Sequence, residues 1–210
     1  MSKIIEDLNW RYATKRFDST RKISEKDVEI IKESLRLVPS SYGLQPLKYI
    51  FVESKNIREQ LVPASYGQRQ VQDASHLILI CSHQKMEEKQ IDAYLENVAK
   101  TRDVELSTTK GYGDFMKQTI SRMSENEIKS WNDKQAYIAL GQLLQTCSTL
   151  RIDATPMEGF DSTQYAEILG MNNEEYKINL VCPIGYRHEE DSSKDLKKVR
   201  KSLEELFEIK

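Results

Sequence analysis

The sequence is poor in cysteine, glycine and proline, with 3, 8 and 5 of these among 210 residues. Cys81, Cys147 and Cys182 form no CxxC pair, and each lies in an apolar run, where cysteine is most often a small buried hydrophobic residue. This usage favours a reducing compartment over a disulfide-bonded secreted fold. The glycines and prolines are scattered, so no linker or repeat marks a domain boundary. We therefore predict one domain spanning residues 1–210.

Long hydrophobic runs and a strong charge of one sign are also missing. The amino terminus, MSKIIEDLNW, lacks the apolar stretch of a signal peptide, and no window of the sequence has the length of a membrane span. The formal net charge is −2, which argues against an overall electrostatic attraction to nucleic acid or an anionic membrane. We expect a cytoplasmic protein with neither of these partners, in which any basic site is local.

The sequence signatures of several enzyme classes are absent as well. No GxGxxG follows a predicted strand and no GxxxxGK[ST] occurs, so neither a Rossmann dinucleotide site nor a P-loop is supported. HExxH and GxSxG are missing, and the histidines at 76, 83 and 188 lack metal-ligand spacing. We interpret His76, at the head of an apolar strand, as a structural residue and expect no metal.

Capping residues and apolar spacing predict the main helices. Ser24 and Asp27 form a capping-box pattern ahead of apolar residues at helical spacing, which continue towards Pro39. A second box, Ser124 with Glu127, opens a long helix that is apolar nearly all round, as expected for a central buried helix. Two shorter helices are predicted over residues 91–98 and 162–170.

Apolar runs predict strands over residues 48–53, 76–81 and 178–186. Residues 101–114 are polar and contain glycines, which is typical of a loop. The tail, KDLKKVRKSLEELFEIK, is basic first and then amphipathic. Because helices outnumber strands and connect several of them, we predict a layered α+β domain.

Five short segments remain that no helix or strand explains fully. They are RYATKRF (11–17), PSSYGLQP (39–46), SYGQRQVQDASH (65–76), TPMEGFD (155–161) and LKKVR (196–200). Each alone has a structural interpretation: a serine pair ends a helix, and a basic cluster in a tail is usually a solvated face. Together, in this order, they resemble the FMN-dependent nitroreductase family, especially its oxygen-insensitive NAD(P)H nitroreductase branch. The resemblance covers Ile5 to about Arg200.

The resemblance implies a three-layer α+β fold with a mixed, mostly antiparallel sheet flanked by helices. It also implies a homodimer with two FMN sites at the interface. Arg11, Lys198 and Arg200 match the residues that bind the FMN phosphate, which suits guanidinium and ammonium groups. Lys15 matches a lysine beside the pyrimidine edge of the flavin, where a cation stabilises negative charge on the reduced ring.

Other segments match parts of the same site. The turn at Glu158 and Gly159 matches the one whose backbone N–H approaches flavin N5, and Pro39–Ser41 matches the segment that the second subunit contributes. Tyr42, Tyr112 and Phe115 are the expected substrate-channel residues, although Phe115 has an equal interpretation as the first core residue of a helix. The full set of expected FMN-binding residues is Arg11, Tyr12, Ala13, Lys15, Pro39, Ser40, Ser41, Gly43, Gly67, Gln70, Pro156, Met157, Glu158, Gly159, Lys198 and Arg200.

The chain departs from the family pattern at four of these positions. Tyr12 and Ala13 stand where many relatives have His-Ser, and Gly67 and Gln70 stand where a well-studied branch has asparagine and lysine. Because Gln70 brings no charge, we expect a less positive ring environment and a lower flavin potential.

The sequence thus predicts an FMN-dependent NAD(P)H oxidoreductase that reduces nitroaromatics, quinones or similar acceptors in a ping-pong sequence of hydride transfers. We expect no catalytic side chain, because the flavin carries the hydride. Two other classes stay open: an FMN-binding protein without turnover and a flavin-free interaction protein. Within the enzyme class, a reductase of a specific aldehyde, enone or pteridine is a further alternative.

Overall fold

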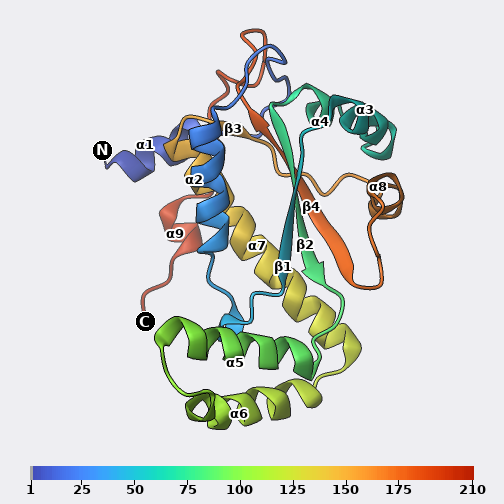
Figure 1. Ribbon diagram of the computed structural model, residues 1–210. Helices are drawn as coiled ribbons and strands as arrows, with labels where there is room; N and C mark the ends of the chain where they lie inside the picture. Colours follow the sequence, from blue (N-terminus) through green and yellow to red (C-terminus); the bar gives the residue numbers. More distant parts are fainter. Residues whose placement is uncertain (1) are drawn as a thin grey trace.

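The computed structural model describes residues 2–210, which fold around a four-stranded antiparallel sheet of order β1-β2-β4-β3 (Figure 1). The strands are β1 (Leu47–Val52), β2 (His76–His83), β3 (Asp153–Ala154) and β4 (Tyr176–Gly185). β2 pairs with β1 on one side and with β4 on the other, so its apolar residues are buried on both faces. All described pairs are antiparallel, and the parallel pairing implied by a mixed sheet is not found within residues 2–210.

Helices cover both faces of the sheet. α2 (Glu25–Arg36) and α7 (Glu125–Thr149) pack on the face to which Ile78 and Ile80 point. α3 (Lys55–Ala64), α4 (Gln70–Asp73) and α8 (Ser162–Leu169) cover the opposite face, against Leu77 and Leu79. α1 (Lys3–Trp10) lies against α7. The predicted three-layer α+β fold is confirmed.

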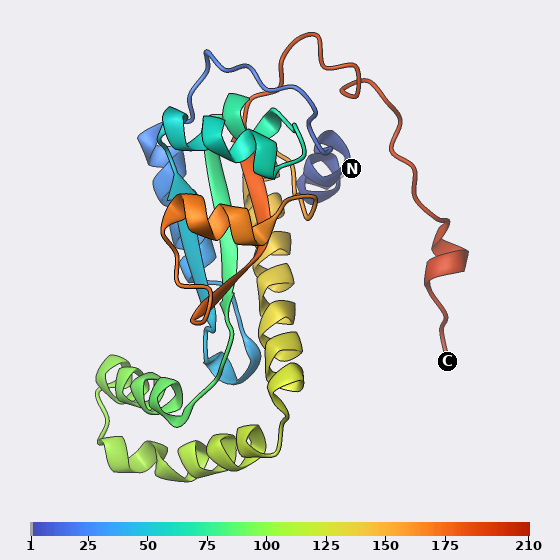
Figure 2. The same ribbon diagram turned by 90° about the vertical axis from the view of Figure 1, so that its right-hand side faces the viewer.

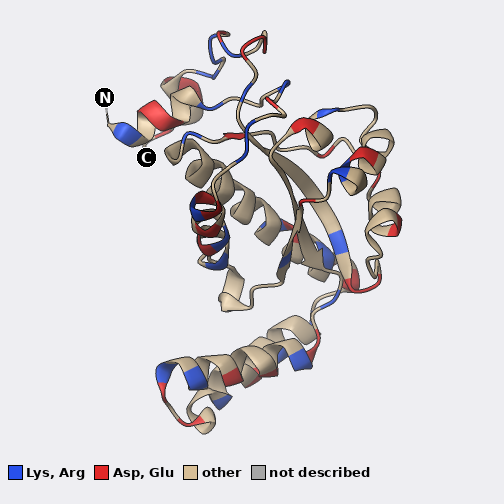
Figure 3. Ribbon diagram, turned by 45° about the horizontal axis from the view of Figure 1, so that its top comes forward, with Lys and Arg blue, Asp and Glu red and all other residues tan. Residues whose placement is uncertain are grey.

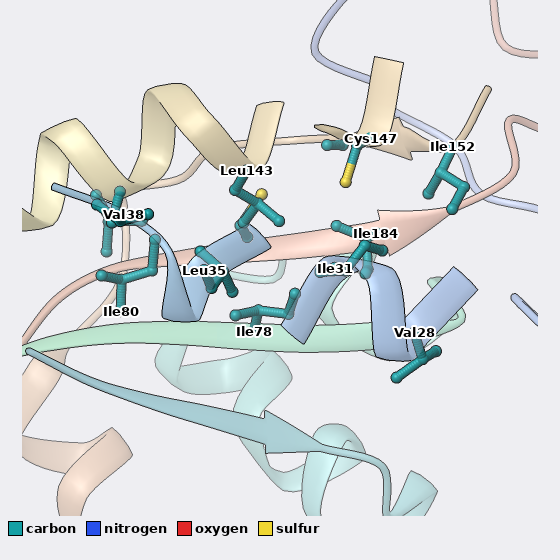
Figure 4. Packing of buried hydrophobic residues seen from close by; sticks show 14 of the residues in the cluster. Val28, Ile31, Leu35, Val38, Ile78, Ile80, Leu143, Cys147, Ile152 and Ile184 are labelled. Carbon is teal, nitrogen blue, oxygen red and sulfur yellow. The ribbon is translucent and has the colours of Figure 1, made fainter. Parts of the chain in front are cut away.

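The main core forms between α2, α7 and the sheet. Ile31 and Leu35 of α2 and Leu143 of α7 point towards Ile78 of β2 and Ile184 of β4 (Figure 4). All five are almost completely buried. Cys147 is buried in the same cluster, and Cys81 and Cys182 are buried and free as well, as predicted. α7 therefore acts as the central helix that the sequence indicated.

The predicted helix ends agree closely with the structure. The Ser124 hydroxyl accepts from the Glu127 N–H, and the Glu127 carboxylate accepts from the Ser124 N–H, which completes the capping box of α7. At α2 only half of the box forms, since Asp27 pairs with the Ser24 hydroxyl instead of its N–H. α8 ends at Gly170, whose φ of 63° is the left-handed geometry that glycine favours.

A helical arm replaces the loop predicted over residues 101–114. α5 (Glu88–Arg102), a 3₁₀ turn η2 (Leu106–Thr109) and α6 (Lys110–Ser121) project from the body and stand apart from the sheet (Figures 1 and 3). The loop prediction was wrong because the glycines lie inside a helix. A Cβ at Gly113 would lie 2.5 Å from Leu95 Cδ1, so this glycine allows close packing of α6 on α5.

The end of the carboxyl-terminal tail stands apart from the body (Figure 2). Its one helix is short, α9 (Leu203–Leu206). The apolar side chains of the tail are 57% to 99% exposed: Leu196, Val199, Leu203, Leu206, Phe207 and Ile209. In a single copy of the chain these side chains therefore have no core to join.

Candidate functional site

The two ends of the chain meet at a basic pocket. A cavity of about 400 Å³ lies between residues 9–13, after α1, and residues 193–200 of the tail. The Lys198 ammonium donates a hydrogen bond to the backbone carbonyl of Arg11. Five of the residues predicted to bind FMN line this pocket, which we call the basic pocket: Arg11, Tyr12, Ala13, Lys198 and Arg200.

The basic pocket gathers positive charge that lacks a counter-ion. Burial lowers the pKa of Arg11, and the Arg200 guanidinium lowers it further. Burial also lowers the pKa of Lys198, with Arg11 and Arg200 adding to the effect. Within residues 2–210 none of the three forms an ion pair, and the buried Arg11 Nε has no hydrogen-bond partner. A buried cation is normally paired, so this donor set fits a phosphate group.

A buried carboxylate holds the two basic segments in place. Asp191 accepts hydrogen bonds from the backbone N–H of Lys15 at 2.8 Å, of Arg16 at 3.0 Å and of Ser193 at 2.9 Å. The Lys15 side chain itself is exposed. The sequence did not single out Asp191, because it stands among acidic residues in a polar turn and only the Ser193 contact is local.

A second buried carboxylate supports the same region. Asp153 of β3 forms an ion pair with Arg187, with 2.6 Å between Oδ1 and Nη2. The Arg187 guanidinium lies over the rings of Trp10 and Tyr12, 4.3 and 4.6 Å from their centres. Asp153 also accepts from the Thr14 hydroxyl at 3.3 Å. β3 is therefore joined to the segment that carries Arg11.

The predicted turn at Glu158 and Gly159 adjoins this segment. Thr155, three residues before Glu158, donates from its hydroxyl to the Thr14 carbonyl at 2.6 Å. The Tyr137 hydroxyl of α7 donates to Glu158 Oε1 at 2.8 Å. Met157 forms a bridge with Val181 of β4 and is buried. No signal in the sequence pointed to Tyr137, which stands among polar and apolar residues of α7.

The 65–70 segment contacts the same turn through an unexpected residue. Gln68 Nε2 donates to the Gly159 carbonyl at 2.8 Å and to the Ser65 carbonyl at 3.1 Å. Gly67 has a φ of +77° and forms the bend after α3, whereas Gln70 begins α4 and is 9% exposed. Gln68 is thus the glutamine that reaches the turn.

The remaining predicted residues gather at the other end of α7. The Ser41 N–H donates to Gln135 Oε1 at 2.9 Å, within the 3₁₀ turn η1 (Ser41–Gly43). The Tyr42 and Phe115 rings are 6.0 Å apart, edge to face, and Tyr112 lies 6.4 Å from Phe115. Phe115 is 51% exposed, so its alternative interpretation as a core residue is wrong. Pro39 and Ser40 precede this turn.

The two groups of predicted residues lie far apart in one chain. Gln135 lies beside Ser41, whereas Thr149 contacts Asp7 of α1 at 3.4 Å, four residues before Arg11. These two positions are separated by about 21 Å of α7 at 1.5 Å per residue. The long axis of the molecule therefore separates the basic pocket from the aromatic group formed by Tyr42, Tyr112 and Phe115.

Comparison with known proteins identifies the family. Residues 8–186 match the model of the nitroreductase family. This chain belongs to the nitroreductase family. The resemblance to this family seen in the sequence is confirmed.

Individual nitroreductase relatives match over nearly their whole length. The chain is 34% identical over 215 residues to a Staphylococcus saprophyticus protein named "Putative NAD(P)H nitroreductase", covering 98% of this chain and 95% of the relative. It is 32% identical over 213 residues to the major NAD(P)H-flavin oxidoreductase of Aliivibrio fischeri, covering 98% of each. The fold matches a "putative nitroreductase in complex with FMN" from Exiguobacterium sibiricum, with a TM-score of 0.86 at 20% identity over 100% and 98% of the two chains.

Two kinds of site are not found among the described residues. In residues 2–210 no three or more His, Cys, Asp or Glu side chains are grouped so as to hold a metal ion. No helix in that part of the chain combines the length and the apolar character needed to cross a bilayer.

Proposed function

We propose that this nitroreductase-family enzyme takes reducing equivalents from NAD(P)H and passes them to nitroaromatics, quinones or similar planar acceptors in a ping-pong sequence. The observation that carries the proposal is the basic pocket, where Arg11, Lys198 and Arg200 meet without a counter-ion beside the Glu158–Gly159 turn. When bound, FMN supplies the hydride chemistry.

In this proposal the residues of the chain bind the cofactor and orient it. Arg11, Lys198 and Arg200 hold the FMN phosphate through charge-assisted hydrogen bonds. Lys15, on the segment fixed by Asp191, faces the pyrimidine edge of the ring. The Glu158–Gly159 turn directs a backbone N–H to the reacting edge, and Tyr137 and Gln68 fix the shape of that turn.

A second copy of the chain completes the site. One chain separates Pro39–Gly43 from the basic pocket by about half of α7, so an antiparallel partner is needed to bring both to one cofactor. Exposed apolar side chains support this arrangement: Tyr137 and Ile138 on α7 are 46% and 45% exposed, and those of the tail are more exposed still. Tyr42, Tyr112 and Phe115 would then line the acceptor pocket of the partner's flavin.

Flavin titration tests the phosphate clamp. Arg11→Met is expected to weaken FMN binding at least about tenfold, because a charge-assisted hydrogen bond in a partly buried pocket is lost. Lys201→Met is the control, since Lys201 is exposed and does not line the basic pocket. Equal FMN affinity in both variants contradicts the assignment of the basic pocket.

Anaerobic mixing separates the enzyme from a flavin-binding protein without turnover. The FMN-loaded protein is expected to bleach near 450 nm when NADH or NADPH is added and to regain its colour when a quinone follows. A protein that stays yellow with both nicotinamides contradicts the proposal, whereas one that takes up no FMN contradicts the flavin assignment itself.

Sedimentation tests the role of the second copy. Ile138→Glu places a charge on the exposed face of α7 and is expected to shift the protein towards monomer and to weaken FMN binding together. Ile30→Glu on α2 is the matched control, since Ile30 is 40% exposed against 45% for Ile138. A variant that sediments as a monomer and keeps full FMN affinity contradicts a shared site.

A further inference from the structure

A second cavity, of about 560 Å³, lies at the β1 edge of the sheet between the starts of α2 and α3. Its walls come from the segment that leads into α2, from the first turn of α3 and from the start of β2. It shares no lining residue with the basic pocket. We call it the edge cavity, and no part of the proposed flavin chemistry uses it.

A buried arginine forms its inner wall. Arg58 of α3 is 1% exposed, and its Nη1 donates to the Ala74 carbonyl at 2.5 Å. Its Nε is buried without a hydrogen-bond partner, and among residues 2–210 it forms no ion pair. The nearby Asp73 carboxylate partly offsets the lowering of the Arg58 pKa by burial, but Asp73 pairs with Arg69 at 3.4 Å. A buried guanidinium usually has a directly bonded carboxylate or phosphate partner, because leaving it unpaired is costly.

Two lysines add to the charge of the edge cavity. Lys22 and Lys55 line it, and neither forms an ion pair within the described chain. Burial lowers the pKa of Lys22, and Arg58 and Lys55 lower it further. The Lys22 ammonium is therefore repelled by two cations that line the same space, and a bound anion relieves such repulsion.

Ser75 and His76 supply a neutral donor beside these cations. The Ser75 hydroxyl oxygen accepts from the Ile23 N–H at 2.9 Å and lies 3.0 Å from His76 Nδ1. When the hydroxyl donates its proton to Nδ1, the imidazole carries its proton on Nε2. His76 lines the edge cavity, so this N–H is a donor for a ligand oxygen.

The carboxylates of the edge cavity lie at exposed positions. Glu29 is already paired with Lys32 at 2.8 Å, and Glu25 and Glu53 are exposed and form no ion pair with the three cations. The inner wall, where Arg58 is buried, is thus cationic, whereas the exposed rim carries Lys22 and Lys55 beside the carboxylates. Such an arrangement suits a ligand with an anionic group at the inner wall and hydroxyl groups at the mixed-charge rim.

We propose that the edge cavity binds the phosphate group of a small hydroxylated phosphate monoester, with Arg58, Lys22 and Lys55 as its cationic partners. A phosphate group carries about two negative charges and therefore matches three cations better than a singly charged carboxylate does. The cavity exceeds the size of a bare phosphate and leaves room for the rest of a small metabolite.

Histidine NMR of the FMN-loaded protein tests this proposal with inorganic phosphate as the probe. The chain has three histidines, so the His76 Cε1–H resonance is readily identified with a His76→Gln variant. A saturable shift of His76 is expected, together with a rise in its pKa, which burial now lowers. His83 lines a different cavity, and its resonance is the internal control that should not shift.

Exposed lysines provide matched variants that leave the buried arginine intact. Lys55→Met is expected to raise the dissociation constant for phosphate about tenfold. Lys26→Met, on α2 and outside the edge cavity, should leave the dissociation constant unchanged. The proposal fails if His76 does not respond, if both variants weaken binding equally, or if acetate at the same concentration shifts His76 as strongly as phosphate does.

Discussion

The Asp191 carboxylate fixes the amino-terminal basic segment by accepting a hydrogen bond of 2.8 Å from the backbone N–H of Lys15. The same side chain accepts from Arg16 and from Ser193, so segments near the two ends of the chain share one buried anchor. The geometry of the basic pocket therefore depends on a residue that does not line it.

Asp191→Ala is expected to lower the free energy of unfolding by about 1–3 kcal/mol, because buried backbone N–H groups lose their acceptor. FMN binding should weaken with it, since Arg11 and Lys198 are no longer held in register. Asp191→Asn keeps one acceptor oxygen and should lose less. Urea unfolding and flavin titration measure both effects, with the exposed Asp195→Ala as control. Wild-type FMN affinity in Asp191→Ala contradicts the anchoring role.

The same carboxylate gives a pH dependence of stability. Burial raises the pKa of Asp191, but the backbone hydrogen bonds from Arg16, Ser193 and Lys15 outweigh burial and lower the pKa below the usual value of an aspartate. A carboxyl group whose pKa is lowered by folding stabilises the folded state at pH values above its pKa in the unfolded chain. This contribution is lost as the pH falls through its pKa in the folded protein. Unfolding measured from about pH 6 to about pH 3 should show a smaller acid loss in Asp191→Asn than in wild type. Identical acid profiles contradict this.

Tyr137→Phe removes the hydrogen bond to Glu158 with little change in packing. The bond to Glu158, with burial and nearby acidic charge, raises the pKa of Tyr137 to about 12. Because both groups are partly exposed, stability should fall by less than about 1 kcal/mol. The rate of flavin reduction by NAD(P)H should fall more than FMN affinity does, since the proposed function places the turn at the reacting edge of the flavin. Stopped-flow reduction with Tyr66→Phe as control measures this, and equal rates in the two variants contradict it.

Short-range signals in the sequence predicted the fold well. Capping boxes and unbroken apolar runs predicted α2, α7, β2 and β4, because the residues that determine each of these elements lie close together in the sequence. α6 was not predicted, because Gly111 and Gly113 indicate a loop unless the packing of Gly113 against Leu95 is known.

The site depends on contacts between distant segments. Nothing near Arg11 shows that Lys198 will reach its carbonyl, and only the family resemblance joined them. Asp191 was not distinguished from Glu189 and Glu190, since burial is decided by the tertiary fold. Gln68 was not singled out, because the fold after the bend at Gly67 determines which side chain faces Gly159.

Two glycines should respond oppositely to alanine. A Cβ at Gly185 would lie 2.8 Å from the Ser75 backbone nitrogen and 3.1 Å from Phe17 Cδ1, so Gly185→Ala should cost about 1–3 kcal/mol. Gly111 lies in α6 with open space around it, and Gly111→Ala should stabilise by about 0.5–1 kcal/mol. Thermal unfolding of both variants measures the difference, and equal shifts contradict the close contact at Gly185.

Arg187→Met should strongly destabilise the protein, although the Arg187 side chain is partly exposed. It leaves the Asp153 carboxylate buried without its ion partner and removes a guanidinium that covers Trp10 and Tyr12. Breaking a buried pair from one side costs about 3–5 kcal/mol. Arg187→Lys keeps the charge but loses the fork and the stacking, so it should recover only part of this loss.

An exposed arginine provides the comparison for Arg187. Arg69 pairs with Asp73 at 3.4 Å and is 68% exposed, so Arg69→Met should change stability by no more than about 1 kcal/mol. Urea unfolding of the three variants gives the order directly. If Arg187→Met costs no more than Arg69→Met, the Asp153 pair does not hold the amino-terminal segment, and β3 must be joined to it by the Thr14 contacts alone.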